Sequence, residues 1–287
     1  MKKKWIVITA LSALVVGGSA LTISANNDGY YLYKTAMKNT HTLASATASI
    51  ESTVKINGEI MQAIEMDGKY NLNQKAAQGT MKLSLNEQTE QIDVALQDSQ
   101  FYIKNNALDQ TFAVKSKTVK TVKKIPHHDP DLMKIGEKIF DTVTVPLHDN
   151  FKVDNNKITV DLTNNDIPAL FREIGQYMVK KGTVAHENAT MSTSEYPFLS
   201  TDISANLPVL TDNIKIDSAK LMVELTNDNL IDEQTMYMKV SGEDKNGKRH
   251  VIEMNTKMDF DNMNKTTLEN VIIDENVQTI ELKNAHH

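Results

Sequence analysis

The residue types that most often perform catalysis form no recognisable site in this sequence. The 287 residues include no cysteine, which excludes thiol nucleophiles, thiolate metal ligands and disulfides. Residues Gly242–Lys248 resemble a phosphate-binding loop, but Arg249 stands where such a loop needs Ser or Thr to hold magnesium. Neither a G-x-S-x-G nor an H-E-x-x-H motif occurs. We therefore expect a non-catalytic protein without a cofactor.

Histidine and aspartate come together internally at His127, His128 and Asp129. Adjacent side chains on an extended chain point to opposite sides, so both imidazoles cannot readily bind one ion. A loop or helix-capping role is the better interpretation, and we expect no metal site.

Methionine is the residue type whose spacing suggests binding. The chain has 14 methionines, and their flexible, polarizable side chains suit surfaces that accept variable apolar ligands. Alternation places them on one face of two predicted neighbouring strands, beneath the apolar stripe of a predicted helix. The candidate lining of an apolar cavity is Met236, Met238, Ile252, Met254, Met258, Phe171, Ile174 and Met178. The alternative is that these residues are ordinary core.

Two runs of short strands position these side chains. From Thr47 to Phe112, apolar or small residues recur at every second position, which is typical of an antiparallel meander with one wet face. Asn57-Gly58 and Asp67-Gly68 are predicted turns within it. The pattern returns at 214–225, 232–240 and 250–260, where Asn246-Gly247 is the predicted turn, with candidate closing strands at 271–273 and 277–282.

Helical patterns lie outside these runs. The spacing predicts helices at 28–43, 129–143 and 167–181, with a short one near 200–206. Asp28 can cap the first of them. We therefore expect an α+β fold, in which a strongly curved antiparallel sheet (an incomplete barrel) wraps over two or three helices. Residues 26–287 would form a single domain, whose sheet halves (about 45–116 and 214–282) are joined by a helical middle (about 129–206).

The N-terminus predicts where the domain resides. Lys2-Lys3-Lys4 precede an uncharged stretch at 5–25 that small residues close, as in a cleaved signal peptide. The stretch is also long enough to span a bilayer, so an uncleaved anchor with membrane contact through residues 5–25 is the alternative. Either way, residues 26–287 are expected outside the cytoplasm.

Charge limits the choice of partners. The formal net charge is −6 although three lysines open the chain, so no domain-wide basic surface exists for a nucleic acid. Lys115–Lys124 holds five lysines in ten residues. That run could attract anionic envelope polymers or lipid headgroups, but a solvated strand or loop is the simpler interpretation.

The order of elements resembles a known superfamily. A secretion signal, an N-terminal helix (30–43), a long meander, inserted helices and a second meander ending in Phe260-Asp-Asn-Met-Asn-Lys are similar to the LolA and LppX/LprG-like envelope lipoprotein carriers. The resemblance is architectural and covers most of residues 28–283. It implies a hydrophobic cavity for acyl chains and no catalysis, although the mycobacterial branch has a lipobox cysteine that this chain lacks. The chain also looks like uncharacterised extracytoplasmic proteins of spore-forming Gram-positive bacteria.

Together these patterns predict an extracytoplasmic protein that binds an amphiphile or lipid-like envelope component non-covalently. The alternative is a structural or interaction module of the envelope, with a solid core and a protein or polymer partner that contacts edge strands or the lysine run.

Overall fold

The computed structural model describes residues 28–85, 88–98, 100–115, 145–186, 189–205, 207–269 and 276–281. The predicted signal or anchor, His127-His128-Asp129 and the helix predicted at 129–143 lie outside these ranges, as does almost all of the lysine run.

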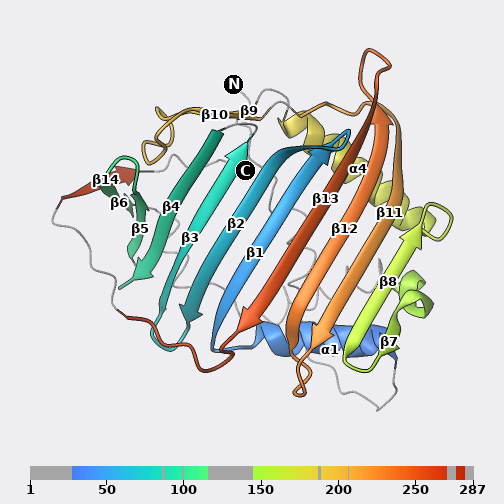
Figure 1. Ribbon diagram of the computed structural model, residues 1–287, viewed down its shortest axis with the longest axis horizontal. Coiled ribbons are helices and arrows are strands. Elements are labelled where there is room, and N and C mark those ends of the chain that lie inside the picture. Colours follow the sequence, from blue (N-terminus) through green and yellow to red (C-terminus); the bar gives the residue numbers. More distant parts are fainter. Residues whose placement is uncertain are drawn as a thin grey trace.

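One sheet of twelve strands dominates the described structure (Figure 1). Its order is β14-β6-β5-β4-β3-β2-β1-β13-β12-β11-β8-β7. The strands of the N-terminal half are β1 (Ser45–Ile56), β2 (Glu59–Asn71), β3 (Ala76–Leu85), β4 (Gln88–Gln97), β5 (Gln100–Asn105) and β6 (Gln110–Lys115). The later strands are β7 (Lys152–Asp154), β8 (Lys157–Thr163), β11 (Asp212–Leu225), β12 (Ile231–Glu243), β13 (Arg249–Asp261) and β14 (Val277–Glu281).

The two halves join through β1 and β13, which pair antiparallel from Thr47–Asp261 to Ile56–Ile252. Every neighbouring pair is antiparallel except β14 and β6, which pair in parallel, so the sheet is mixed. A separate two-stranded sheet pairs β9 (Ala189–Met191) with β10 (Ile203–Ala205).

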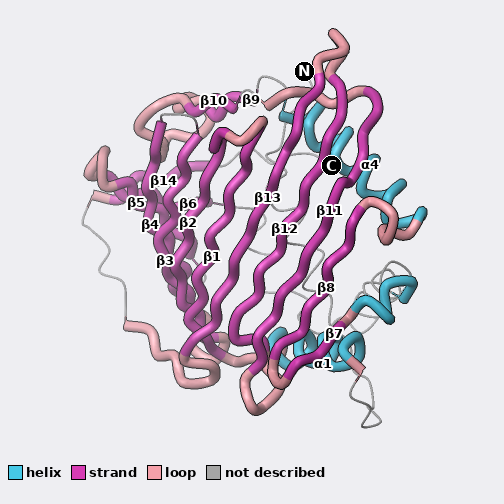
Figure 2. Tube along the Cα trace, turned by 45° about the vertical axis from the view of Figure 1, so that its right-hand side comes forward, coloured by secondary structure: helices cyan, strands magenta, loops and turns pink. Residues whose placement is uncertain are grey.

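Two α-helices lie on one side of the large sheet in the described part of the chain (Figures 1 and 2). They are α1 (Gly29–His41), whose N-cap Asp28 accepts a 3.0 Å hydrogen bond from the Tyr30 N–H, and α4 (Ala169–His186). A 3₁₀ helix, η2 (Val145–Asn150), lies beside β8 and α1. We call the side of the sheet that faces α1 and α4 the inner face, and the opposite side the outer face.

The expected sheet wrapped over two or three helices, an incomplete barrel, is wrong. The structure has one broad, open, mixed sheet, whose edges β14 and β7 do not meet in the strand order. Closure needs an edge-to-edge pairing with matched stagger, and the edge strands here have only five and three residues. The described helices cover separate parts of the inner face instead of filling a barrel.

Local turn chemistry explains both the correct and the wrong predictions. Asn57-Gly58 and Asn246-Gly247 form the predicted turns, and Asn57, Gly58 and Gly247 have the positive φ that such turns require (53°, 93° and 75°). Asp67-Gly68 does not turn, because β2 continues through it. The helix predicted near 200–206 is also wrong, because Ile203–Ala205 is strand β10.

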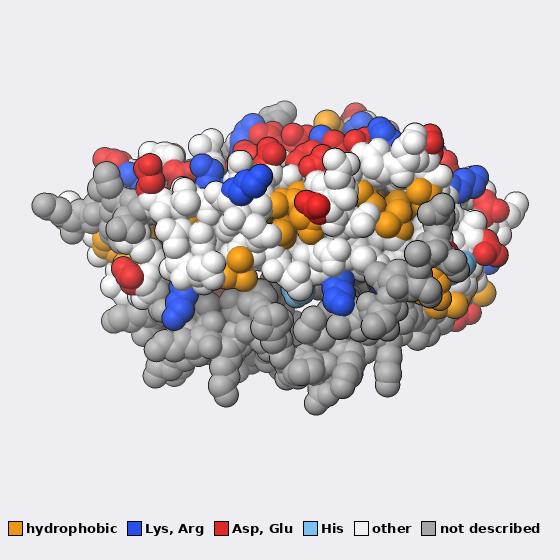
Figure 3. Space-filling view, turned by 90° about the horizontal axis from the view of Figure 1, so that it is seen from below, with side chains coloured by type: hydrophobic (Ala, Val, Ile, Leu, Met, Phe, Trp, Pro, Cys, Tyr) orange, Lys and Arg blue, Asp and Glu red, His pale blue; other side chains and the backbone are white. Residues whose placement is uncertain are grey.

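The outer face is charged. Directly opposite residues on neighbouring strands form ion pairs there, such as Lys220–Asp161 (2.9 Å) and Lys239–Glu253 (3.1 Å). Figure 3 shows acidic and basic side chains gathered along this side of the molecule. Such exposed pairs add little stability each, but they keep the outer face soluble.

The inner face is apolar and packs in three clusters of buried side chains. One lies over β3–β6 and includes Phe198 and Leu199; the second lies near α4 and includes Ile216 and Val240; the third lies beneath α1 and includes Tyr33. These three clusters therefore all lie on the inner face.

Candidate functional site

The strand register brings the predicted methionines together on the inner face. Met238 of β12 lies directly opposite Met254 of β13, and Val240 lies opposite Ile252. Met236 and Met258 continue the same faces of the two strands, but they pair with Thr256 and Gln234 instead of with each other.

The residues predicted to line the cavity fall into two groups, those that pack in the cluster near α4 and those that do not. Met238, Ile252, Met254 and Phe171 belong to the cluster near α4, in which Ile252 is buried and the others are half-buried. These four therefore resemble core. Ile174 lies in α4, as does Met178, but their side chains are outside the described ones.

A row of directly opposed residues crosses the middle of the inner face. Met258, Ile50, Met66, Met81 and Ile92 face one another in turn across β13, β1, β2, β3 and β4. We call these five residues the apolar row. Ile92 is buried, Met258, Ile50 and Met81 are half-buried, and Met66 is 38% exposed. Among the described residues, Met66 is thus the exposed member of the row, and the other four are buried or half-buried like the residues near α4.

Buried amide side chains end the apolar row on both sides. Gln234 follows Met258 on β12, and Asn105 follows Ile92 on β5. Gln234 is 1% exposed and Asn105 is 0% exposed. A buried polar group is costly unless it is hydrogen-bonded, so the partners of these two amides decide what each end of the row can do.

The two amides differ in their partners. Gln234 accepts a hydrogen bond at Oε1 from the Tyr33 hydroxyl of α1 (3.1 Å), while its Nε2 has no acceptor in the described structure. Asn105 is satisfied on both sides. Its Nδ2 donates to Glu90 Oε2 (3.0 Å) and to the Phe198 carbonyl (2.8 Å), and its Oδ1 accepts from the Ala107 N–H (2.8 Å).

Glu90 fastens the segment after β9 to the sheet. Its Oε1 accepts hydrogen bonds from the N–H groups of Ser200 and Thr201 (both 2.9 Å) and from the Ser200 hydroxyl. Burial acts to raise the pKa of Glu90, but the hydrogen bonds from Ser200, Asn105 and Thr201 outweigh it, so the pKa lies below its ordinary value. The carboxylate is therefore ionised and structural at neutral pH.

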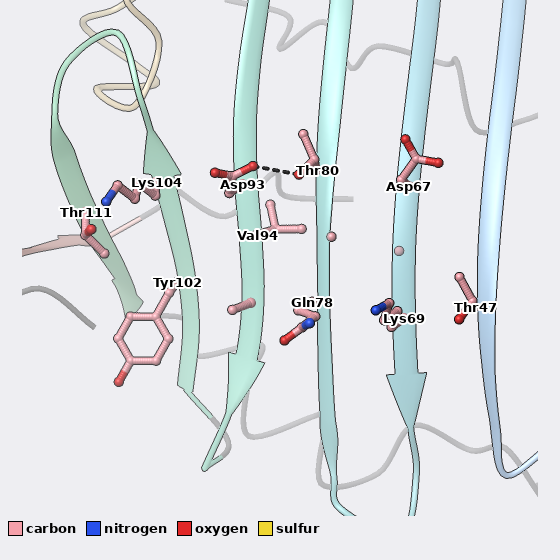
Figure 4. Close-up of a pocket in the computed structure, with 13 residues that line it drawn as sticks. Thr47, Asp67, Lys69, Gln78, Thr80, Asp93, Val94, Tyr102, Lys104 and Thr111 are labelled. Carbon is pink, nitrogen blue, oxygen red and sulfur yellow. Dashed lines mark hydrogen bonds between the residues drawn. The ribbon is translucent and has the colours of Figure 1, made fainter. Parts of the chain in front are cut away.

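A depression of about 390 Å³ lies on the outer face over β1–β6 (Figure 4). Its charged lining consists of two carboxylates and two amines, Asp67, Asp93, Lys69 and Lys104. The Asp93 carboxylate is held on both oxygens, by the Thr80 hydroxyl (2.7 Å) and by the amide of Asn106 (3.1 Å). We call this surface the outer depression. Its positive and negative charges balance, and the Tyr102 ring lies at one side of it. It suits a neutral or zwitterionic polar partner.

The described residues carry no arrangement that predicts a reaction. No three metal-ligating side chains come close enough to hold an ion in the part of the chain that the structure describes. The buried carboxylate of Glu90 accepts hydrogen bonds from Ser200 and Thr201, in the segment 198–201 (the strap), and from Asn105 at the end of β5. These hydrogen bonds hold the strap to the sheet.

Sequence reasoning missed the N-terminal part of this site. Alternation at Ile50, Met66 and Met81 was visible as a pattern, but a pattern does not give the register that aligns them with Met258. Glu90, Asn105 and Gln234 could have been noticed as polar residues at positions that the period of two assigns to the apolar face.

Comparisons with known proteins identify no family. No protein-family model and no curated protein matches the chain, so the resemblance to envelope lipoprotein carriers stays a prediction. Among the solved structures that match the chain are two of weak similarity. One, on lipid–protein interactions in lipovitellin, has 8% identity and a TM-score of 0.26, and the match covers 80% of this chain but 26% of the other. The second, a porin-like protein from Bacteroides uniformis, has 11% identity and a TM-score of 0.21. This match covers 76% of this chain and 96% of the other.

The chain therefore spans about a quarter of the lipovitellin chain. Similarity at these TM-scores establishes neither a shared fold nor a shared function. Among the described helices, none combines the length and apolar character needed to cross a bilayer.

Proposed function

We propose that this protein is a non-catalytic, extracytoplasmic binding protein for a single-chain amphiphile or lipid-like envelope component. The observation that supports the proposal is the apolar row, because it is a continuous line of apolar side chains across five strands of the inner face, with Met66 exposed at its middle. Burying such a surface against an acyl chain is favourable at roughly 25 cal/mol per Å².

Two sequence features support the remaining parts of the proposal. Residues 1–25 have the pattern of a signal peptide or anchor, which favours a location outside the cytoplasm. Methionines at Met258, Met66 and Met81 can adapt to acyl chains of different lengths because the side chain is unbranched.

The test is native and denaturing mass spectrometry of the full chain purified from a bacterial host, followed by organic extraction. We expect stoichiometric co-purified lipid in the wild type. Met258→Trp should reduce it at least about fivefold, because the larger side chain fills space that the acyl chain would occupy, and a loss of about 1 kcal/mol of binding free energy is about fivefold in affinity.

The matched control is Met222→Trp, since Met222 is 54% exposed and lies on β11 between outer-face Lys220 and Glu224. It should leave the bound lipid unchanged. A wild-type chain of clean apo mass that also fails to take up a fluorescent fatty acid would contradict the function.

The outer depression favours a second candidate, an interaction module of the envelope. Its balanced charges and its hydroxyl and amide groups, such as Gln78 and Thr80, match a neutral polar polymer or a peptide better than an acyl chain. Retention of the wild-type chain on neutral cell-wall glycan, lost in Tyr102→Ala but kept in Met258→Trp, would support this candidate.

A further inference from the structure

We propose that the bound amphiphile lies along the apolar row in one orientation, with an oxygen-acceptor headgroup at Gln234 and its tail toward Ile92. The inference rests on the proposed function and deepens it, because it names the headgroup chemistry and the direction of the chain. It is argued from a difference between the two amide side chains that end the row. Asn105 is fully hydrogen-bonded, whereas the amide nitrogen of Gln234 has no acceptor in the described structure.

The length of the row suits one acyl chain. Neighbouring strands lie about 4.8 Å apart, so the four steps from Met258 to Ile92 span about 19 Å. Two opposed acyl layers fill a bilayer core of about 30 Å, so one chain extends about 15 Å. A single extended chain laid across the strands therefore fits between Gln234 and Asn105.

At the Gln234 end of the apolar row, the side-chain amide nitrogen lacks a hydrogen-bond acceptor in the described structure. The side chain is 1% exposed and its Nε2 has no hydrogen-bond partner in the described structure, while Tyr33 already occupies Oε1. A buried amide nitrogen without an acceptor is destabilising. A carboxylate or ester oxygen placed beside Met258 would satisfy it, and Met258 is the residue directly opposite Gln234 in the row.

The Asn105 end offers no such opening. Glu90, Phe198 and Ala107 use its amide nitrogen and oxygen, and Ile92 beside it is 5% exposed. The headgroup is thus directed to Gln234, and the methyl end of the chain meets the buried side chains near β4.

The headgroup is tested by displacement of a fluorescent fatty acid from the full chain with palmitate, methyl palmitate or hexadecylamine. Both oxygen acceptors should bind at least about tenfold more tightly than the protonated amine, which offers donors only. Gln234→Met removes the amide at nearly constant length and should abolish that preference. Tighter binding of palmitate than of its methyl ester would assign a free carboxylate, and equal binding would assign an ester carbonyl.

Gln62→Met is the matched control. Gln62 is a 4% exposed glutamine on β2, opposite Val54 and Leu85 and away from the apolar row, so the preference should persist. If Gln234→Met folds poorly because its hydrogen bond from the Tyr33 hydroxyl is lost, the double variant Tyr33→Phe/Gln234→Met replaces both groups by apolar ones. It should show the same lost preference.

Orientation is tested with a fatty acid that carries a diazirine at its terminal carbon. Cross-links mapped to Met81 or Ile92 support the proposal, and cross-links mapped to Met258 overturn it. Binding that Gln234→Met leaves unchanged overturns this inference while the proposed function stands. If the wild-type chain takes up no probe, both this inference and the proposed function are overturned. This holds whether the chain is a monomer or a dimer closed by a second copy.

Discussion

At the scale of single residues, polar side chains on an apolar face determine most of what is specific about this protein. Glu90, Asn105 and Gln234 are each buried on the inner face. Two of them form one satisfied network with Ser200 and Thr201, and the third lacks an acceptor for its amide nitrogen. Their alternation was readable from the sequence, but their partners were not, because Ser200 lies 110 residues from Glu90.

Glu90 gives a prediction about acid stability. Its pKa is lowered in the folded protein, so it contributes stability above its ordinary unfolded pKa, and that stability is lost as the pH falls through the lower folded pKa. Glu90→Ala should lower the free energy of unfolding at neutral pH by about 2–3 kcal/mol, because the Ser200 and Thr201 N–H groups lose their acceptor. Urea titrations at neutral and acidic pH measure both effects.

Glu65→Ala serves as the control for Glu90. Glu65 pairs with Lys82 on the outer face, where both side chains are exposed, so its loss should change stability by less than about 1 kcal/mol. Equal losses in the two variants would show that the Glu90 network does not hold the 198–201 strap.

At the scale of elements, two glycines face each other across β2 and β3, one of them in the predicted Asp67-Gly68 turn. Gly68 and Gly79 lie directly opposite each other. A Cβ built on Gly79 would lie 2.5 Å from the Asp67 carbonyl oxygen, whereas one on Gly68 would lie 3.6 Å from that of Gln78. The close approach of the two backbones at Gly79, and not a reversal of the chain, accounts for glycine there.

This asymmetry predicts opposite outcomes for two similar substitutions. Gly79→Ala should destabilise the protein by about 1–3 kcal/mol, because its methyl group meets backbone that cannot move aside. Gly68→Ala should be neutral or slightly stabilising, because its methyl group makes an ordinary contact and restricts the unfolded chain. Thermal unfolding of the two variants beside the wild type measures the difference, and equal midpoints would contradict the close approach.

Elements could be predicted where the signal is local. Asp28 before α1 and the Asn57-Gly58 and Asn246-Gly247 turns depend on a few neighbouring residues, and the structure confirms them. Asp67-Gly68 carried the same turn signal, yet pairing with β3 prevailed. Barrel closure and the cover of the methionines by α4 depend on contacts between distant segments, so no local pattern could decide them.

At the scale of the whole molecule, the sheet has a long-stranded centre and short edges. Strands β1, β12 and β13 have 12 or 13 residues and are paired on both sides, whereas edge strands β7 and β14 have three and five. Short edges with charged residues, such as Lys152 and Asp154 in β7, discourage pairing with other chains.

Hydrogen exchange should follow that gradient. Amides of β1 and β13 should exchange at least about a hundredfold more slowly than those of β7 and β14, because the centre opens only with global unfolding. Exchange followed by mass spectrometry on the full chain measures this. Protection of β14 equal to that of β13 would mean that the parallel edge is as stable as the centre.

The β1–β13 pairing has a consequence for the order in which the protein is made. Ser52 and Thr256, which share a hydrogen bond across this pair, are 204 residues apart. Contacts of such sequence separation slow folding, since a long loop must close before they form. The N-terminal meander must therefore wait, with one side of β1 unpaired, until the thirteenth strand has been synthesised. During that wait Ile50 lacks its β13 neighbour Met258, so a nascent chain is the state in which this protein is most prone to aggregate.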